Sequence, residues 1–214
     1  MRSVLRGGVV VVLLTVLLFP LSCKKDEPVI VEDDVNQIEQ SEFPLMVGNW
    51  WKYKVTDFYA GTTDTLTVKV IGVEDSSVNT KRFSCLLFMK GLVVDSSEIV
   101  ISENEISYKG LNPYYSYFGN YKLVFPIALN DEWVGFNNPD TIRVVGVSEN
   151  VEIEGTLYAQ IYSLKRSFFL VGGYNLNQLL LISPKVGIVN QSIDLFTGAS
   201  AQKQTFSLIE YSLN

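Results

Sequence analysis

The chain has 214 residues, a formal net charge of -6, two cysteines and no histidine. Without histidine, Ser-His-Asp and Cys-His catalysis and every histidine-ligated metal centre are excluded. Two cysteines are too few for a disulfide framework or a structural zinc site, so we expect no metal and no cofactor. An acidic chain also lacks the basic surface that nucleic acids require, and we expect no nucleic-acid partner.

The amino terminus has the pattern of an export signal that ends in a cysteine. Arg2 and Arg6 flank the start of an apolar stretch over residues 7–19, which is too short to span a bilayer but suits the helix of a signal peptide. The following Leu21-Ser22-Cys23 resembles a bacterial lipobox, although Pro20 departs from the usual pattern. This resemblance implies a signal peptide over 1–22 and acylation of Cys23, which would hold the protein on the lipid bilayer. An ordinary cleaved signal and an uncleaved anchor are the alternatives.

The segment after the cysteine is strongly acidic. CKKDE resembles the first residues of lipoproteins from Bacteroidetes-type bacteria, which implies the outer membrane and leaves the periplasmic and cell-surface faces open. Residues 24–42 show no sustained strand or helix period, and we expect 23–42 to be a lipidated cysteine followed by a disordered tether. A flexible chain of this length reaches roughly 25 Å.

An internal repeat divides the remaining chain. FPLMVGNWW over residues 43–51 returns as FPIALNDEW over 125–133, and residues 64–73 resemble 140–147 in the same order. Two matches in one order predict two homologous β-units, 43–124 and 125–214.

Alternation of apolar and polar residues predicts strands in both units. In residues 51–56 it places Trp51, Tyr53 and Val55 on the buried face, with Trp133 as the matching anchor of the second unit. Further strands are expected at 65–73, 82–90, 98–102, 105–109, 151–165, 178–183, 186–196 and 203–213. We therefore predict an all-β, antiparallel fold in which the two units form a curved sheet, an open barrel or a sandwich.

The same residues carry a resemblance over most of 43–214. The FPLxVGNxWxY start, the late Gly187-Ile188-Val189 and a carboxyl-terminal strand ending LIEYSL resemble a broad set of Bacteroidetes-type bacterial lipoproteins. The resemblance implies an exported β-domain and assigns no catalytic residues.

A cluster of aromatic residues between the units is the main binding candidate. Tyrosine rings offer flat, amphipathic contact area for a glycan or a protein surface. Packing across the joint between the units is the alternative role. The cluster consists of Tyr114, Tyr115, Tyr117, Phe118 and Tyr121.

Acidic and hydroxyl side chains supply weaker candidates. Asp131-Glu132 beside Trp133, and the group Glu149, Glu152 and Glu154, are the carboxylates that a hydrolase without histidine would use. A turn role for Asp131 explains it equally well. Asp64-Thr65 and Asp140-Thr141 resemble acceptor sites of Bacteroidetes O-glycosylation, and shared strand-start geometry is the alternative.

These observations favour a protein that is not an enzyme. We expect an outer-membrane-anchored lipoprotein whose β-domain binds an envelope protein or a glycan. The alternative is a carrier of apolar ligands such as lipids with a cavity lined by β-strands. A carboxylate-based hydrolase is the third hypothesis.

Overall fold

A computed structural model describes residues 37–77, 79–110, 121–135, 140–170, 174–197 and 200–214. Residues 36–214 form one compact unit. Its strands are β1 (Gln37–Ile38), β2 (Trp50–Asp57), β3 (Thr62–Ser77), β4 (Thr80–Met89), β5 (Leu92–Ser102), β6 (Glu105–Gly110), β7 (Tyr121–Val124), β8 (Ile127–Ala128), β9 (Glu132–Val134), β10 (Thr141–Ile153), β11 (Thr156–Leu170), β12 (Tyr174–Ser183), β13 (Gly187–Thr197) and β14 (Ser200–Ser212).

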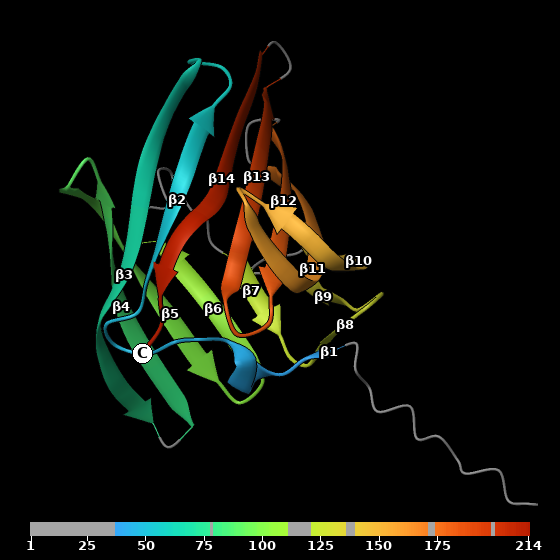
Figure 1. The fold of residues 1–214 in the computed structure, drawn as a ribbon. Helices are drawn as coiled ribbons and strands as arrows, with labels where there is room; N and C mark the ends of the chain where they lie inside the picture. The colour runs from blue at the N-terminus through green and yellow to red at the C-terminus, as the bar shows by residue number, and fades with distance from the viewer. Residues whose placement is uncertain (1–36, 78, 111–120, 136–139, 171–173, 198–199) are drawn as a thin grey trace, which may run out of the picture. The chain divides into compact units, whose positions relative to one another are not determined.

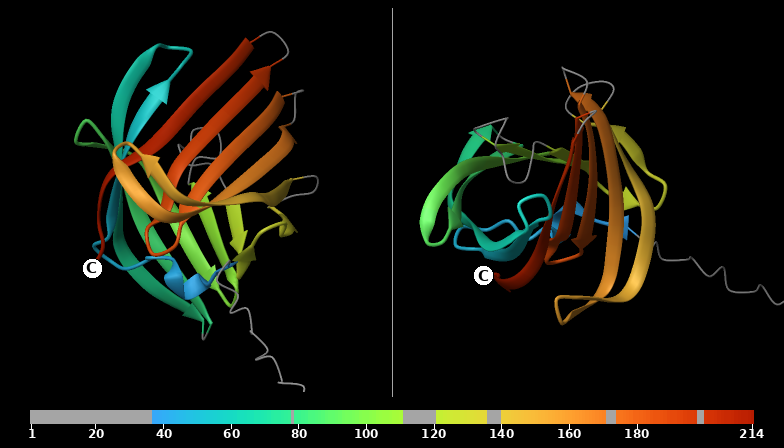
Figure 2. Two further views of the ribbon diagram at one scale, coloured as in Figure 1. Left: turned by 45° about the vertical axis from the view of Figure 1, so that its right-hand side comes forward. Right: turned by 90° about the horizontal axis from the view of Figure 1, so that it is seen from above.

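Twelve strands form one antiparallel sheet in the order β7-β6-β5-β4-β3-β2-β14-β13-β12-β11-β10-β9. The sheet curls into a nearly closed, barrel-like form, and its two halves face each other across the interior (Figures 1 and 2). The predicted all-β, antiparallel architecture is confirmed, and the sheet is a single one. β1 and β8 make a separate two-stranded pair.

The strand order consists of two six-stranded meanders side by side. Residues 50–124 supply β2 to β7, residues 132–212 supply β9 to β14, and the first strand β2 pairs with the last strand β14. Each meander therefore forms from local hairpins, and the two are joined by a pairing between distant parts of the chain.

The two meanders begin with the same backbone contacts. In the first, the Gly48 amide donates to the Val70 carbonyl and the Val70 amide donates to the Asn49 carbonyl, both at 2.9 Å. In the second, Asn130 and Asp131 make the same pair of bonds to Val144, at 3.2 and 2.9 Å. A β-bulge follows Val70 in β3 and Val144 in β10. These bulges fix which positions of the two meanders match.

The core lies on the inner face of the sheet. The predicted alternation is confirmed in β2, where Trp51, Tyr53 and Val55 are buried, and Trp133 packs partly buried against the same core. A turn at Glu103-Asn104 joins β5 to β6, and Thr197 pairs with Ser200 where β13 meets β14.

The beginning of the domain differs from the expected tether. Residues 37–42 are ordered: Gln37 and Ile38 pair with Ala128 and Ile127, and a short 3-10 helix follows over Gln40–Glu42. Ile38 is fully buried, so its apolar side chain fixes a segment that composition alone assigned to the tether. The prediction of disorder was therefore wrong for 37–42.

Candidate functional site

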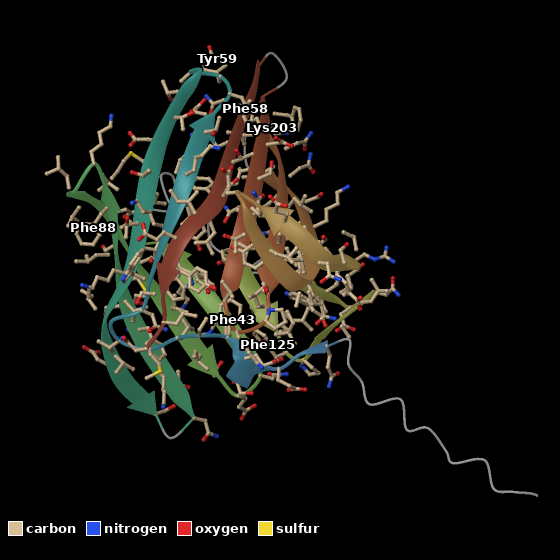
Figure 3. The ribbon with its side chains drawn as sticks, viewed as in Figure 1. Phe43, Phe58, Tyr59, Phe88, Phe125 and Lys203 are labelled. Carbon is tan, nitrogen blue, oxygen red and sulfur yellow. The ribbon has the colours of Figure 1, made fainter. Side chains whose placement is uncertain are left out.

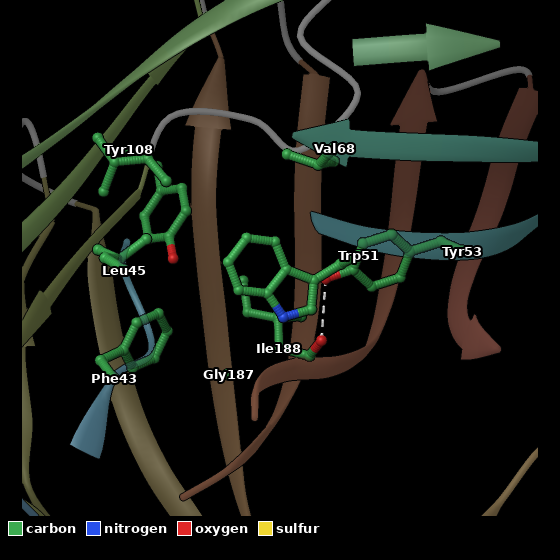
Figure 4. Close-up of a pocket in the computed structure, with 9 residues that line it drawn as sticks. Phe43, Leu45, Trp51, Tyr53, Val68, Tyr108, Gly187 and Ile188 are labelled. Carbon is green, nitrogen blue, oxygen red and sulfur yellow. Dashed lines mark hydrogen bonds between the residues drawn. The ribbon is translucent and has the colours of Figure 1, made fainter. Parts of the chain in front are cut away.

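One end of the interior is apolar and closely packed. Its cavity measures about 30 Å³, which is room for one water molecule (Figure 4). The lining residues are Phe43, Leu45, Trp51, Tyr53, Val68, Ile99, Tyr108, Gly187 and Ile188. Among the described residues this cavity is too small for an acyl chain, and it gives no support to the lipid-carrier alternative.

Two aromatic side chains at this end have their polar atoms bonded to backbone. The Trp51 indole donates to the Val186 carbonyl at 2.8 Å, and the Tyr53 hydroxyl donates to the Ile188 carbonyl at 3.0 Å. Burial raises the pKa of Tyr53 well above its ordinary value. The rings therefore act as neutral core anchors that tie β2 to the region around the start of β13.

The inner face of the second meander carries a buried polar group, which we call the Arg166 cluster: Asp140, Arg166 and Gln178. Arg166 donates from Nε and Nη2 to the two carboxylate oxygens of Asp140, both at 2.7 Å. Its Nη1 donates to Oε1 of Gln178 at 3.2 Å. All three side chains are almost completely buried.

The strands position this cluster through their register. Arg166 on β11 lies opposite Ile142 on β10 and Gln178 on β12, and it alternates with the buried Leu164. Gly135 makes room for Asp140, because a Cβ at this position would overlap the Asp140 carboxylate. The bidentate arrangement is the strong form of a charge-assisted hydrogen bond.

Gln178 is incompletely bonded. Its side chain is 2% exposed, and its Nε2 has no hydrogen-bond acceptor. An unsatisfied buried donor costs about 1–3 kcal/mol. The buried ion pair and this unbonded donor make the Arg166 cluster the candidate polar site of the second meander.

A second candidate is an aromatic turn on the surface. Phe58 and Tyr59, between β2 and β3, are 58% and 72% exposed, and the Lys203 ammonium lies 5.7 Å from the centre of the Phe58 ring (Figure 3). Asp57 fixes the turn, because its Oδ1 accepts from the amides of Tyr59 and Ala60 at 2.9 Å. The turn thus presents two rings in a defined conformation, and neither ring was singled out from the sequence.

The predicted site residues fall mainly outside the described part of the chain. Cys23, Tyr114, Tyr115, Tyr117 and Phe118 all lie there. Tyr121 is described, and it is fully buried with its ring stacked on Tyr108 at 4.2 Å. For Tyr121, this position supports the packing role and leaves no surface for a ligand.

The predicted carboxylates do not converge. Oδ2 of Asp131 accepts from the Ala128 amide at 2.7 Å, which is the turn role. The Glu132 side chain is 55% exposed and lies 4.0 Å from Arg143, while Glu154 pairs with Lys54 at 2.8 Å. Across the described ranges, no group of three or more metal-ligating side chains is placed to hold an ion.

The two Asp-Thr pairs occupy different environments. Thr65 is exposed beside Asp64, whose carboxylate lies 3.0 Å from Lys90. Asp140, by contrast, belongs to the buried Arg166 cluster. Only Thr65 of the two threonines is fully on the surface, and its glycosylation stays a prediction.

The sequence contained a pattern that would have found Arg166. In residues 162–166 the period of two that places Tyr162 and Leu164 inside also places Arg166 inside. A charged residue in phase with buried apolar residues indicates a buried partner, here Asp140. In the part of the chain that is described, no helix has the length and apolarity needed to cross a membrane.

Comparisons with known proteins agree with this architecture. No family model and no curated protein matches the chain. A candidate exported protein with a YmcC-like fold from Bacteroides fragilis is 11% identical, with a TM-score of 0.50 over 79% of this chain and 98% of the other. A candidate lipoprotein from Parabacteroides distasonis is 14% identical, with a TM-score of 0.46 over 80% and 98% of the two chains. The first similarity shows a shared all-β fold.

Proposed function

We propose that this chain is a lipoprotein of the cell envelope, anchored in the outer membrane through acylated Cys23, and that its β-domain binds an envelope protein or a glycan without catalysing a reaction. The observation that carries the proposal is the apolar stretch that ends in Leu21-Ser22-Cys23 ahead of an all-β domain. The fold similarity to a candidate exported protein supports export.

The two meanders are homologous units in this proposal. The support is their matching strand order, the paired bonds to Val70 and Val144, and the bulge that follows each of these valines. Duplication would make the two meanders equivalent halves of the sheet, and the Arg166 cluster lies in the second half.

The anchor is tested by labelling cells with radioactive palmitate. We expect label in the wild-type protein and none in Cys23→Ala, together with release of the variant from outer-membrane fractions. Equal sedimentation of the unlabelled variant with the envelope would contradict the anchor.

The binding role is tested separately with the soluble domain. We expect replacement of Tyr114, Tyr115 and Tyr117 by alanine to abolish co-sedimentation with purified envelope material, while the melting temperature stays unchanged. Binding that survives this triple replacement would assign the tyrosines to packing alone.

A further inference from the structure

The end of the β4–β5 hairpin is apolar and exposed on both faces. Leu92 and Val93, the first two residues of β5, are 71% and 57% exposed, and Val94 follows at 41%. Consecutive residues of a strand point to opposite faces of the sheet, so the side chains of Leu92 and Val93 leave the hairpin in opposite directions. Figure 3 shows Phe88, which pairs with Val93, at the margin of the domain and away from the buried ring of Phe43. The core therefore covers neither face of this hairpin end, which we call the Leu92 tip (residues 88–94).

The backbone of the Leu92 tip is hydrogen-bonded up to its turn. Met89 pairs with Leu92 across a two-residue turn. Lys90 and Gly91 in that turn both have positive φ angles, 52° and 78°, as a tight type I′ turn requires. Strand pairing of this kind leaves few backbone groups without a partner, which is the condition for a polypeptide to enter an apolar medium.

The lysine at the turn is paired with an acid. The Lys90 ammonium lies 3.0 Å from a carboxylate oxygen of Asp64 on β3. The pair leaves no uncompensated carboxylate at the turn that would oppose contact with lipid. A lysine also has a long aliphatic stem, so its ammonium can stay at the level of lipid headgroups while apolar neighbours lie deeper.

Exposure on both faces indicates the kind of partner. A flat protein surface covers one face of a hairpin, whereas the interfacial region of a bilayer surrounds a hairpin end on both faces. From this geometry we propose that the Leu92 tip inserts into the interfacial region of a phospholipid bilayer. The inference rests on the proposed acyl anchor at Cys23, which would hold the domain at a membrane, and it adds a second contact with that membrane.

The length of chain before the domain is sufficient for this contact. Residues 24–36 separate Cys23 from Gln37, the first residue of β1. Fully extended, these thirteen residues span about 45 Å at most. A domain of this size is about 40 Å across, so a tip on the far side of the domain can still reach the bilayer that holds Cys23. The tip needs little affinity of its own, because the anchor gives it a high effective concentration at the lipid surface.

The insertion is tested with the acylated protein in vesicles of phosphatidylethanolamine and phosphatidylcholine, which carry no net charge that would repel an acidic domain. Val93→Cys carries an environment-sensitive fluorophore, and the native Cys85 is buried and stays unlabelled. We expect blue-shifted emission and strong quenching by lipids with a nitroxide on the acyl chain. Leu157→Cys is the matched control, because Leu157 is 66% exposed near the end of the β10–β11 hairpin. Its label should stay in water, with quenching at least about twofold weaker.

Two further variants locate the contact. Leu92→Asp places a carboxylate on the tip, and it should reduce the quenching of a label at position 93 to the level of the control. Leu157→Asp should leave the quenching at position 93 unchanged. Both replaced side chains are exposed, so we expect both variants to keep the wild-type melting temperature and to float with the vesicles.

Two results would overturn the inference. Equal quenching at positions 93 and 157 would mean that the tip stays in water and is left to a protein partner. A blue shift that appears without vesicles and grows with protein concentration would assign the tip to contact between copies of the chain. Flotation reports the anchor separately: a protein that floats without quenching at position 93 retains the anchor and loses this contact, and one that is not acylated and does not float loses both.

Discussion

Two tryptophans hold corresponding places in the meanders. The Trp51 indole donates to the Val186 carbonyl at 2.8 Å, and the Trp133 indole donates to the Lys122 carbonyl at 2.7 Å. Each bond joins one meander to a segment of the other. Both residues therefore combine apolar burial with a fixed long-range polar contact.

Replacement of Trp51 by phenylalanine should measure how much that hydrogen bond contributes to the free energy of unfolding. The change leaves the Val186 carbonyl without its donor, and we expect the free energy of unfolding to fall by about 1–3 kcal/mol. Trp50→Phe, at the less buried neighbouring position on β2, is the control and should cost less. Equal urea midpoints for the two variants would show that the indole bond contributes nothing.

A buried cysteine thiol and buried tyrosine hydroxyls should make the folded protein less stable at alkaline pH. Burial raises the pKa of the Cys85 thiol to about 12, and it raises the pKa values of Tyr108 and Tyr121 as well. The folded state therefore keeps protons that the unfolded chain releases, and stability must decrease as the pH rises from about 9 toward 12.

This dependence can be followed by urea denaturation at pH 7, 9 and 11. We expect lower midpoints at each step, and the part of the tyrosinate absorbance that comes from Tyr108 and Tyr121 should rise only with unfolding. In Cys85→Ala the decrease from pH 9 should be smaller, because one of the groups is gone. A midpoint that is constant up to pH 11 would contradict the assigned burial.

The tip of the β10–β11 hairpin passes over neighbouring strands of the same sheet. Its turn residue Glu154 pairs at 2.8 Å with Lys54 on β2, although β12, β13 and β14 lie between β11 and β2 in the sheet. Figures 1 and 2 show the hairpin in front of these strands. Tyr158 and Ile161 are buried even though β12 pairs with β11 only from Tyr162 onward. The hairpin therefore adds a second layer outside the sheet.

Apolar packing should hold this layer more strongly than the ion pair. We expect Ile161→Ala to lower the free energy of unfolding by about 2–5 kcal/mol. Lys54→Ala should cost less than about 1 kcal/mol, because both charged side chains are partly exposed. Hydrogen exchange over residues 149–160 should accelerate in the first variant and stay near wild type in the second. A larger loss of stability in Lys54→Ala than in Ile161→Ala would mean that the ion pair, and not apolar packing, holds the hairpin on the sheet.

At the scale of the whole molecule, local pattern predicted the strands but not their assembly. Alternation located Trp51, Tyr53 and Val55 on the buried face because the period of two is a property of each strand alone. The β2–β14 pairing joins Trp50 to Ser212, and no local pattern encodes such a distant partner.

The candidate site was missed for a related reason. Aligned by letters, Asp140 falls opposite Asp64, and the two acids look equivalent. Counted back from the bulges after Val70 and Val144, Asp140 matches Leu66, so a charged residue stands where the first meander has an apolar one. Three-dimensional register, not residue identity, therefore exposes the Arg166 cluster.

The seam between β2 and β14 also predicts the effect of shortening the chain. Removal of residues 198–214 would leave β2 and β13 with unpaired edges. It would also remove the buried Phe206 side chain and expose the core around it to water. We expect the shortened domain to lose its cooperative melting transition and to aggregate. A sharp transition near the wild-type temperature would contradict the role of the seam.

That seam also bears on the order in which the chain folds. A polypeptide that emerges amino terminus first can form its hairpins early, yet β2 must wait for β14, the last strand to be made. Until then its edge is open to neighbouring chains. The wait gives chaperones a defined substrate: an incomplete sheet whose first strand has no partner.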